Sequence, residues 1–136
     1  MEIFDSNSCC FACGENNPQG LKLKFEQKGD KTCTTFIPAE IYQGYPGMLH
    51  GGITSTILDD IMSKCVNTLG LAGVTARLEV RFRQSIPIGK PLYVEAWVTK
   101  KKGHLVETEA RAYLEDGEPA AEATGRFMAF RHGKIK

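Results

Sequence analysis

The sequence of 136 residues has no uninterrupted apolar stretch of the roughly 20 residues that a helix needs to cross a bilayer. Its opening residues, MEIFDSNS, have neither the basic start nor the apolar run of a secretory signal. Lysine and arginine are scattered, and the formal net charge is only +1, so no basic surface for nucleic acid or an anionic membrane is predicted. These absences predict a soluble cytoplasmic protein with neither nucleic acid nor membrane as a partner.

Cysteine is present in an odd number, five, which does not make a closed disulfide framework and fits a reducing cytoplasm. Cys10 and Cys13 form a CxxC pair, half of a zinc-site pattern, but no second CxxC and no paired histidine follows. His104 and His132 are isolated. The sequence therefore predicts ordinary thiols in an N-terminal loop, with no bound metal and no redox cofactor.

Internal repeats, low-complexity segments and linkers are also missing, and this length provides for one hydrophobic core, so we expect a single domain over residues 1–136. Apolar residues alternate with lysines at 21–25 and β-branched residues fill 32–37, which predicts a hairpin turning at Gly29 and Asp30. Alternating apolar and polar residues predict four later strands, near 77–83, 92–98, 106–114 and 120–131, joined by short turns.

One long helix is predicted between the hairpin and the later strands. Apolar residues recur at helical spacing from Ile53 to Leu69 after a glycine-rich loop at 42–52, and Gly70 is a stop signal. Because this helix is apolar around most of its girth, it needs cover on several sides. A curved antiparallel sheet of about six strands wrapped around one long central helix provides that cover, so the predicted fold class is α+β.

Three stretches of the sequence resemble the hot-dog thioesterase superfamily, particularly small thioesterases of the phenylacetate-degradation and 4-hydroxybenzoyl-CoA types. They are CFACGENNPQGLKLKF at 10–25, GYPGMLHGGITSTILDD at 44–60 and TARLEVRFRQSIPIGKPL at 75–92. The most specific feature is His-Gly-Gly followed, nine residues after the histidine, by an acidic residue on a buried helix. The resemblance implies a hot-dog acyl-CoA thioesterase that releases free acid and CoA as a homodimer or dimer of dimers.

The same resemblance implies a role for each matching position. The backbone N–H of Gly51, directly after His50, is expected to polarise the thioester carbonyl. Asp59 matches the acidic residue that acts as nucleophile or general base. Ser63, one turn further on, matches a hydroxyl that helps to hold the carboxylate or the attacking water.

Three points stay open in the sequence. Asp60 lies at the other edge of the same polar arc as Asp59, so periodicity does not choose between them, and only the family spacing favours Asp59. Some relatives carry an amide six residues before the histidine, where this sequence has Gly44, so an amide contribution comes from a neighbour such as Gln43 or is absent. His50 also has a plain structural alternative as a helix cap.

The chemistry of thioester hydrolysis suits these residue types. A helix N-terminus presents unpaired N–H groups and a partial positive charge to a developing oxyanion. Gly51 and Gly52 have no Cβ, so a carbonyl can approach the backbone closely. We expect burial beside the apolar helix face to raise the pKa of Asp59 and make it a better base than a surface aspartate.

The spacing of Gly51 and Asp59 carries a further expectation. Eight residues of continuous helix separate them by about 12 Å along the axis. A carbonyl carbon bonded through its oxygen to the Gly51 N–H lies only about 3–4 Å from that nitrogen. Asp59 of the same chain cannot then reach it, which predicts a two-fold dimer with two shared sites, unless the chain bends at Gly51 and Gly52.

An acyl pocket is expected beside the helix. Arg83 is expected to bind a CoA phosphate, although arginines on strands more often form the solvent-exposed face of a sheet. The alternatives are a non-catalytic acyl-CoA-binding protein, and a hydratase or dehydratase in which His50 shuttles a proton. The remaining residues expected to bind substrate are Gly52, Asp60, Met48, Leu49, Met62 and Phe82.

Overall fold

A computed structural model describes residues 9–131, so the MEIFDSNS start and His132 lie outside the described residues. In chain order the elements are β1 (Glu26–Lys28), β2 (Lys31–Phe36), the 3₁₀ turn η1 (Glu40–Tyr42), α1 (Gly51–Asn67), β3 (Leu71–Phe82), β4 (Leu92–Lys102), β5 (Leu105–Tyr113) and β6 (Pro119–Arg131). Among these described elements, no helix has the length and apolar character needed to cross a membrane.

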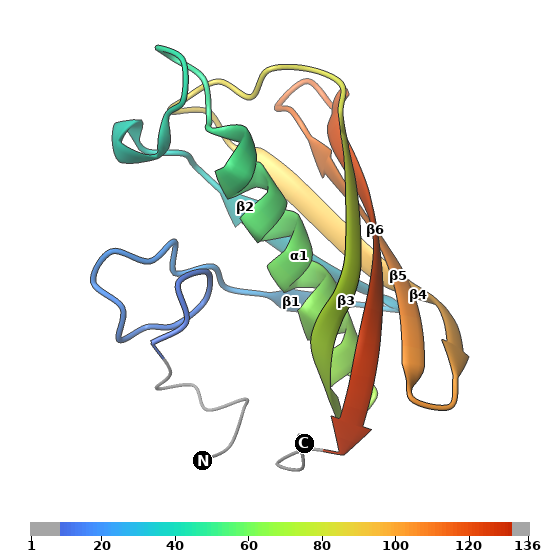
Figure 1. The fold of residues 1–136 in the computed structure, drawn as a ribbon. Coiled ribbons are helices and arrows are strands. Elements are labelled where there is room, and N and C mark those ends of the chain that lie inside the picture. Colours follow the sequence, from blue (N-terminus) through green and yellow to red (C-terminus); the bar gives the residue numbers. More distant parts are fainter. Residues whose placement is uncertain (1–8, 132–136) are drawn as a thin grey trace.

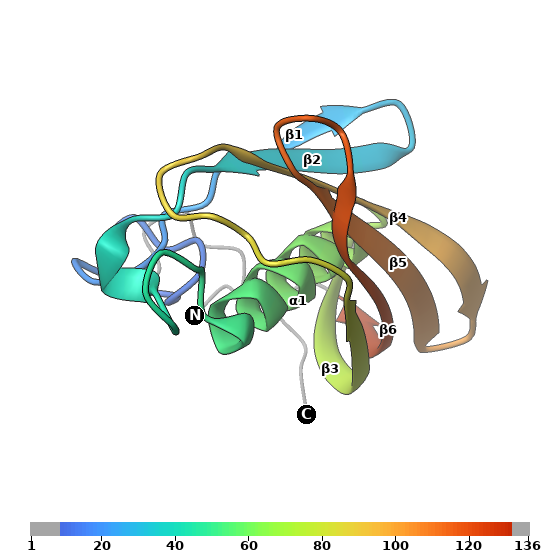
Figure 2. The same cartoon turned by 90° about the horizontal axis from the view of Figure 1, so that it is seen from above.

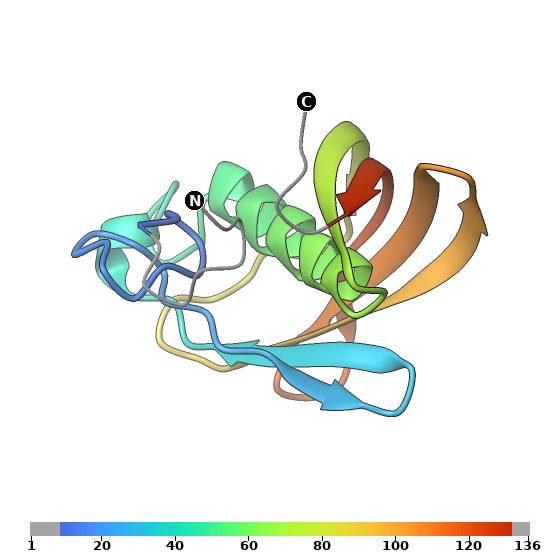
Figure 3. The ribbon, with the colours of Figure 1, turned by 90° about the horizontal axis from the view of Figure 1, so that it is seen from below.

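The six strands form one antiparallel sheet in the order β1-β2-β4-β5-β6-β3. The sheet curves around α1, which lies against its concave face (Figures 1 and 2). The N-terminal loop, residues 9–25, and β3 flank α1 on different sides (Figures 1 and 3). The predicted hot-dog architecture, a curved antiparallel sheet of six strands around one central helix, is confirmed.

Helix α1 is the centre of the core. Its apolar residues recur three or four positions apart, and Ile57, Leu58, Ile61 and Met62 are completely buried against the sheet. Each such side chain contributes about 1.5–3 kcal/mol through burial, which outweighs the modest helix propensity of the β-branched residues. The helix predicted at 53–69 is confirmed, although it begins two residues earlier, at Gly51, and ends two residues earlier, at Asn67.

The first predicted strand is wrong. Residues 21–25 lie outside the sheet, and their backbone bonds to the N-terminal loop instead. The Leu21 N–H donates to the Phe11 carbonyl (2.8 Å) and the Leu23 N–H to the Ala12 carbonyl (2.9 Å). The alternation correctly predicted that Leu21 and Leu23 are buried. A two-residue period reports burial, but it does not show whether the backbone of the segment bonds to a strand or to a loop. Only Glu26–Lys28 remains as strand β1.

Strand β3 lies at the edge of the sheet and pairs within the described chain only with β6. It begins at Leu71, six residues before the predicted start, and a bulge interrupts its register between Thr75 and Arg77. Leu78 and Phe82 remain 37% and 53% exposed. The apolar side chains of β3, which predicted a half-buried strand, are therefore only partly buried within one chain.

Candidate active site

The N-terminus of α1 is capped by His50. This residue is extended (φ −62°, ψ 132°), and its Nδ1 accepts a hydrogen bond of 2.8 Å from the Gly52 N–H. Because Nδ1 accepts, the ring proton of a neutral His50 resides on Nε2. No hydrogen bond in the described part of the chain uses the Gly51 N–H. Gly51 is exposed, so its N–H is a free donor at the positive end of α1.

A cavity of about 670 Å³ opens beside this donor. It lies between the loop that leads into α1, the first turn of α1, and the chain that leaves β3. Sequence reasoning had selected six of its lining residues: Met48, Leu49, His50, Gly51, Phe82 and Arg83. The other six lining residues were not predicted to bind substrate, although Gly44 was noted as the position where some relatives carry an amide: Gly44, Tyr45, Thr54, Gln84, Ser85 and Ile86.

Five of the eleven predicted site residues are not among those that line this cavity: Asp59 and Asp60, described below, and Met62, Gly52 and Ser63. Met62 is completely buried in the core, where its methyl group lies against Gly125. Gly52 faces a separate, smaller hollow beside η1. Ser63 is half-buried further along α1. In one chain, then, the structure brings the helix N-terminus together with an apolar pocket, without a carboxylate.

Asp59 lies on the flank of α1 that faces the edge strand. Its Oδ1 accepts a hydrogen bond of 2.7 Å from the Thr75 hydroxyl on β3. Asp59 is half-buried and Thr75 is exposed, so this pair lies where the sheet ends. One carboxylate oxygen is thus held by the hydroxyl, while the other is bonded to no group among the described residues.

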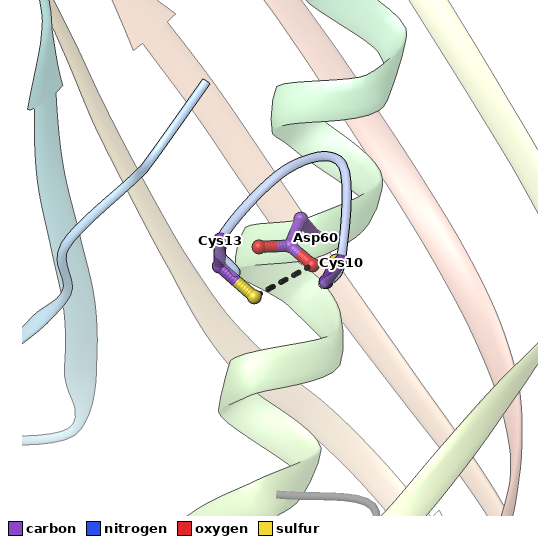
Figure 4. A group of neighbouring side chains, drawn as sticks. All are labelled: Cys10, Cys13 and Asp60. Atoms are coloured by element: carbon purple, nitrogen blue, oxygen red, sulfur yellow. Dashed lines mark hydrogen bonds between the residues drawn. The ribbon is translucent and has the colours of Figure 1, made fainter. Parts of the chain in front are cut away.

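Asp60 belongs to a different neighbourhood, on the flank of α1 beneath the N-terminal loop. The Cys13 thiol lies 3.9 Å from its Oδ1, and Cys10 lies beside both (Figure 4). Burial raises the pKa of the Asp60 carboxyl, and burial together with the charge of Asp60 raises the pKa of Cys13 to about 12. Burial therefore raises the pKa of Asp60, a residue for which the sequence had not predicted such a shift.

Three polar side chains in or near the cavity already have partners. Gln43 accepts a hydrogen bond from the Gly47 N–H (3.1 Å) and so stabilises its own loop. Gln84 supplies the one amide side chain in the cavity lining, and it donates to the Pro119 carbonyl (3.1 Å). Arg83 is paired with Glu122 (2.8 Å), which lowers the pKa of that carboxyl. A CoA phosphate would have to compete with Glu122 for Arg83.

Comparison with known proteins identifies the family to which this chain belongs. A sequence model of the thioesterase superfamily matches residues 46–121, more than half of the chain. The chain belongs to the thioesterase superfamily. The acyl-coenzyme A thioesterase THEM4 of Bos taurus is 28% identical over 126 residues, which cover 90% of this chain and 52% of that protein. The chain thus spans about half the length of this relative.

Solved structures agree with the family assignment. A thioesterase superfamily protein, RHA08564, superposes with a TM-score of 0.82 at 26% identity, covering 87% of this chain and 62% of the other. The protein BH2602 of Bacillus halodurans, solved with CoA, gives a TM-score of 0.66 at 27% identity, with 71% and 70% of the two chains covered. The fold expected from the sequence is therefore that of known thioesterases.

Proposed function

We propose that this protein hydrolyses acyl-CoA thioesters, with the Gly51 N–H polarising the carbonyl and the carboxylate supplied by the partner's Asp59. The observation that carries the proposal is the unbonded Gly51 N–H, which lies at the N-terminus of α1 and beside an apolar cavity. A preorganised donor at a helix N-terminus stabilises the charge that develops on the thioester oxygen. The CoA bound in BH2602 of Bacillus halodurans supports CoA as the group carried by the substrate.

The carboxylate must come from a second chain because α1 is continuous. Gly51 is its first residue and Asp59 lies within it, so the bend that would weaken the spacing argument is absent from this helix. Eight residues of helix correspond to about 12 Å along the axis. A thioester bonded to Gly51 is therefore out of reach of the Asp59 in the same chain.

The edge strand supports a two-fold partner. The Phe82 ring lies beside Gly51, 3.6 Å from where a Cβ would stand, and Thr75 bonds to Asp59. If β3 paired antiparallel with the partner's β3 about an axis at Glu79, next to Leu78, Phe82 would lie opposite Thr75 of the partner subunit. Gly51 would then lie level with the partner's Asp59, and the same would hold at the second site.

The exposed apolar side chains of β3 fit this assembly. An unpaired edge with Leu78 and Phe82 exposed is unusual for a lone chain, because it offers its backbone and apolar surface to other strands. Pairing two such strands would bury both. A homodimer, alone or as half of a dimer of dimers, follows from the proposed site.

Within that site each residue has a distinct task. Thr75 holds one oxygen of Asp59, which leaves the other to attack the carbonyl carbon or to take a proton from water. Ser63 follows one turn later on α1, where its hydroxyl would help to hold the attacking water. His50 holds Gly52 and so keeps the first turn of α1 in shape. No step of this hydrolysis uses a metal or redox cofactor. We also propose a cytoplasmic location, as the sequence predicts.

The cavity supplies a place for the acyl group. Met48, Leu49 and Phe82 give it an apolar lining, and Phe82 stands directly beside the donor at Gly51. An acyl chain bound there would exclude water from the thioester while its carbonyl oxygen meets the helix N-terminus. Arg83, at the rim, would meet a phosphate only after leaving Glu122.

The first test is a thiol-release screen over short, long and aromatic acyl-CoAs, with an enoyl-CoA included. We expect free CoA to appear with at least one saturated acyl-CoA. A hydratase would instead change the enoyl group and leave the thioester intact, and a binding protein would retain the ligand without turnover. Binding of all substrates without thiol release would contradict the proposed function.

The second test concerns the dimer. Leu78→Lys places two like charges close to the proposed two-fold axis, so we expect the variant to run as a monomer in sedimentation and to lose thioesterase activity. Ile37→Lys is the matched control, because Ile37 is 61% exposed just after β2, at the other side of the sheet. A Leu78→Lys protein that stayed dimeric and active would contradict the proposed interface.

The alternative of a hydratase or dehydratase finds less support in the geometry. That chemistry requires a histidine free to exchange protons with the substrate. In this structure His50 Nδ1 is committed to the Gly52 N–H, and only Nε2 remains. While Nδ1 accepts that bond, a neutral His50 carries its proton on Nε2, so the free nitrogen can donate a proton but cannot take one up.

A further inference from the structure

Cys10, Cys13 and Asp60 form a cluster outside the proposed active site. Their sulfur and carboxylate atoms all lie within 4.8 Å of one another. The two cysteines come from the N-terminal loop, and Asp60 comes from the flank of α1 beneath it (Figure 4). A hydrogen bond from the Gly14 N–H to the Cys10 carbonyl (2.8 Å) closes the loop and brings both thiols to the same side. Residues distant in sequence thus converge on one point.

The Asp60 carboxylate is poorly satisfied in this cluster. Among residues 9–131, its Oδ2 is buried without any hydrogen-bond partner, and its Oδ1 has only the 3.9 Å contact with the Cys13 sulfur. Lys64 lies one turn along α1, but its ammonium group lies over the Phe25 ring and makes no ion pair in the described part of the chain. Buried carboxylates are ordinarily hydrogen-bonded, paired or bound to a metal, so an orphaned oxygen beside two thiols requires an explanation.

We propose that Cys10, Cys13 and Asp60 bind a zinc ion that fixes the N-terminal loop to α1. Around a tetrahedral zinc ion, a thiolate sulfur at about 2.3 Å and a carboxylate oxygen at about 2.1 Å lie about 3.6 Å apart. The present distance between the Cys13 sulfur and the Asp60 Oδ1 is 3.9 Å, and no pair of ligand atoms is more than 4.8 Å apart, so side-chain rotations that move these atoms by about 1 Å bring them to zinc-binding distances. Two thiolates and one carboxylate give three ligands, and a water molecule completes the tetrahedron.

Charge and ligand chemistry favour this assignment. Soft thiolates combined with one carboxylate suit zinc, whereas magnesium and calcium prefer oxygen ligands alone. Three negative ligands around a divalent cation leave one negative charge, and Lys64 supplies a compensating positive charge nearby, where it already favours the ionised forms of Cys13 and Asp60. Thiols bind zinc in their deprotonated form, so metal binding here is accompanied by release of protons.

The sequence did not predict this metal site. The expectation of no bound metal rested on the absence of a second CxxC or a paired histidine. The third ligand here is an aspartate on α1, 47 residues from Cys13, and no local spacing rule connects them. The ion would hold the loop against the residue that follows Asp59, so it is a structural site beside the proposed catalytic carboxylate.

The test uses the full chain, reduced and stripped of metal with a chelator, and titrated with Co²⁺ and then Zn²⁺. We expect one Co²⁺ per chain with a thiolate-to-cobalt charge-transfer band, displaced by Zn²⁺. Cys13→Ser and Asp60→Asn should each weaken Co²⁺ binding at least tenfold. Cys33→Ser is the matched control, because Cys33 is a half-buried thiol on β2 outside the cluster, and its binding should equal that of the unmodified protein.

A thermal melt separates ligand loss from misfolding. Zn²⁺ should raise the Tm of the unmodified protein and of Cys33→Ser, and should leave the Tm of Asp60→Asn unchanged. Three results would overturn the proposal: no thiolate band after reduction, equal Co²⁺ affinity in Asp60→Asn, or binding abolished by Cys33→Ser. If the reduced protein bound no cobalt but formed a Cys10–Cys13 disulfide in air, the two cysteines would be a redox-active pair and not zinc ligands.

Discussion

Asp59→Asn is expected to lower thiol release by about 10²–10⁴-fold, the range that a positioned acid–base group contributes. The asparagine oxygen can still accept the hydrogen bond from the Thr75 hydroxyl, so the fold and the dimer should persist. Only the charge and basicity of the carboxylate are removed. The measurement is the initial rate of CoA release, with the acyl-CoA that the screen identifies and with ligand binding followed in parallel.

The matched control for that substitution is Asp60→Asn. This change is isosteric, concerns the adjacent residue, and affects the other flank of α1, under the N-terminal loop. We expect the variant to keep most of its thioesterase activity, because Asp60 lies away from the edge strand where the partner would bind. If Asp60→Asn were the inactive variant and Asp59→Asn the active one, the carboxylate has been assigned to the wrong residue.

Gly51→Pro is the second large expected effect, because proline at the first position of a helix removes the N–H while keeping helical geometry. The residue before a proline must be extended, and His50 already is, with ψ at 132°. Loss of one such donor lowers the rate by about 10²–10³-fold. Gly51→Ala, which keeps the N–H and places its methyl at ordinary contact distance from Phe82, should retain more activity.

Mixing the two inactive proteins then tests whether the site is shared. A dimer of one Asp59→Asn chain and one Gly51→Pro chain has one site with both native groups and one site with neither. Random reassortment makes half of the dimers mixed, so about a quarter of the native activity should return. If each site used groups from a single chain, every site would lack one of them and no activity would return.

The helix and the strands after it could be predicted because burial dictates their periods. Ile57, Ile61 and Cys65 recur four residues apart on one face of α1 and are all buried, and the later strands alternate as a half-covered sheet requires. Residues 21–25 show the limit of this reasoning. Their alternation reports burial correctly, but burial against the N-terminal loop and burial within a sheet produce the same pattern.

The two aspartates show a limit of another kind. Consecutive residues on a helix differ by about 100° in direction, so Asp59 and Asp60 both fall at the margins of the polar arc. What separates them is the neighbour that each one meets, Thr75 on β3 or Cys13 in the loop. Those neighbours lie 16 and 47 residues away, and only the folded chain brings them close.

The lining of the cavity could be predicted only in part. Gly51 and Phe82 were accessible from motif spacing and strand alternation. Tyr45, Ser85 and Ile86 lie in loops, where no periodicity constrains direction, and their position depends on how two loops meet above α1. A backbone hydrogen bond from the Leu49 N–H to the Ile86 carbonyl (2.8 Å) joins those loops, and no local sequence pattern predicts this bond.

The open edge of β3 also bears on how such a protein responds to its own abundance. If each chain holds one half of two sites, an isolated chain turns over nothing, and below the dissociation constant of the pair the rate grows with the square of the chain concentration. A twofold rise in expression would then raise flux about fourfold until the chains are mostly associated. Cells would therefore see a threshold in hydrolysis that arises from strand pairing alone, without any separate regulator.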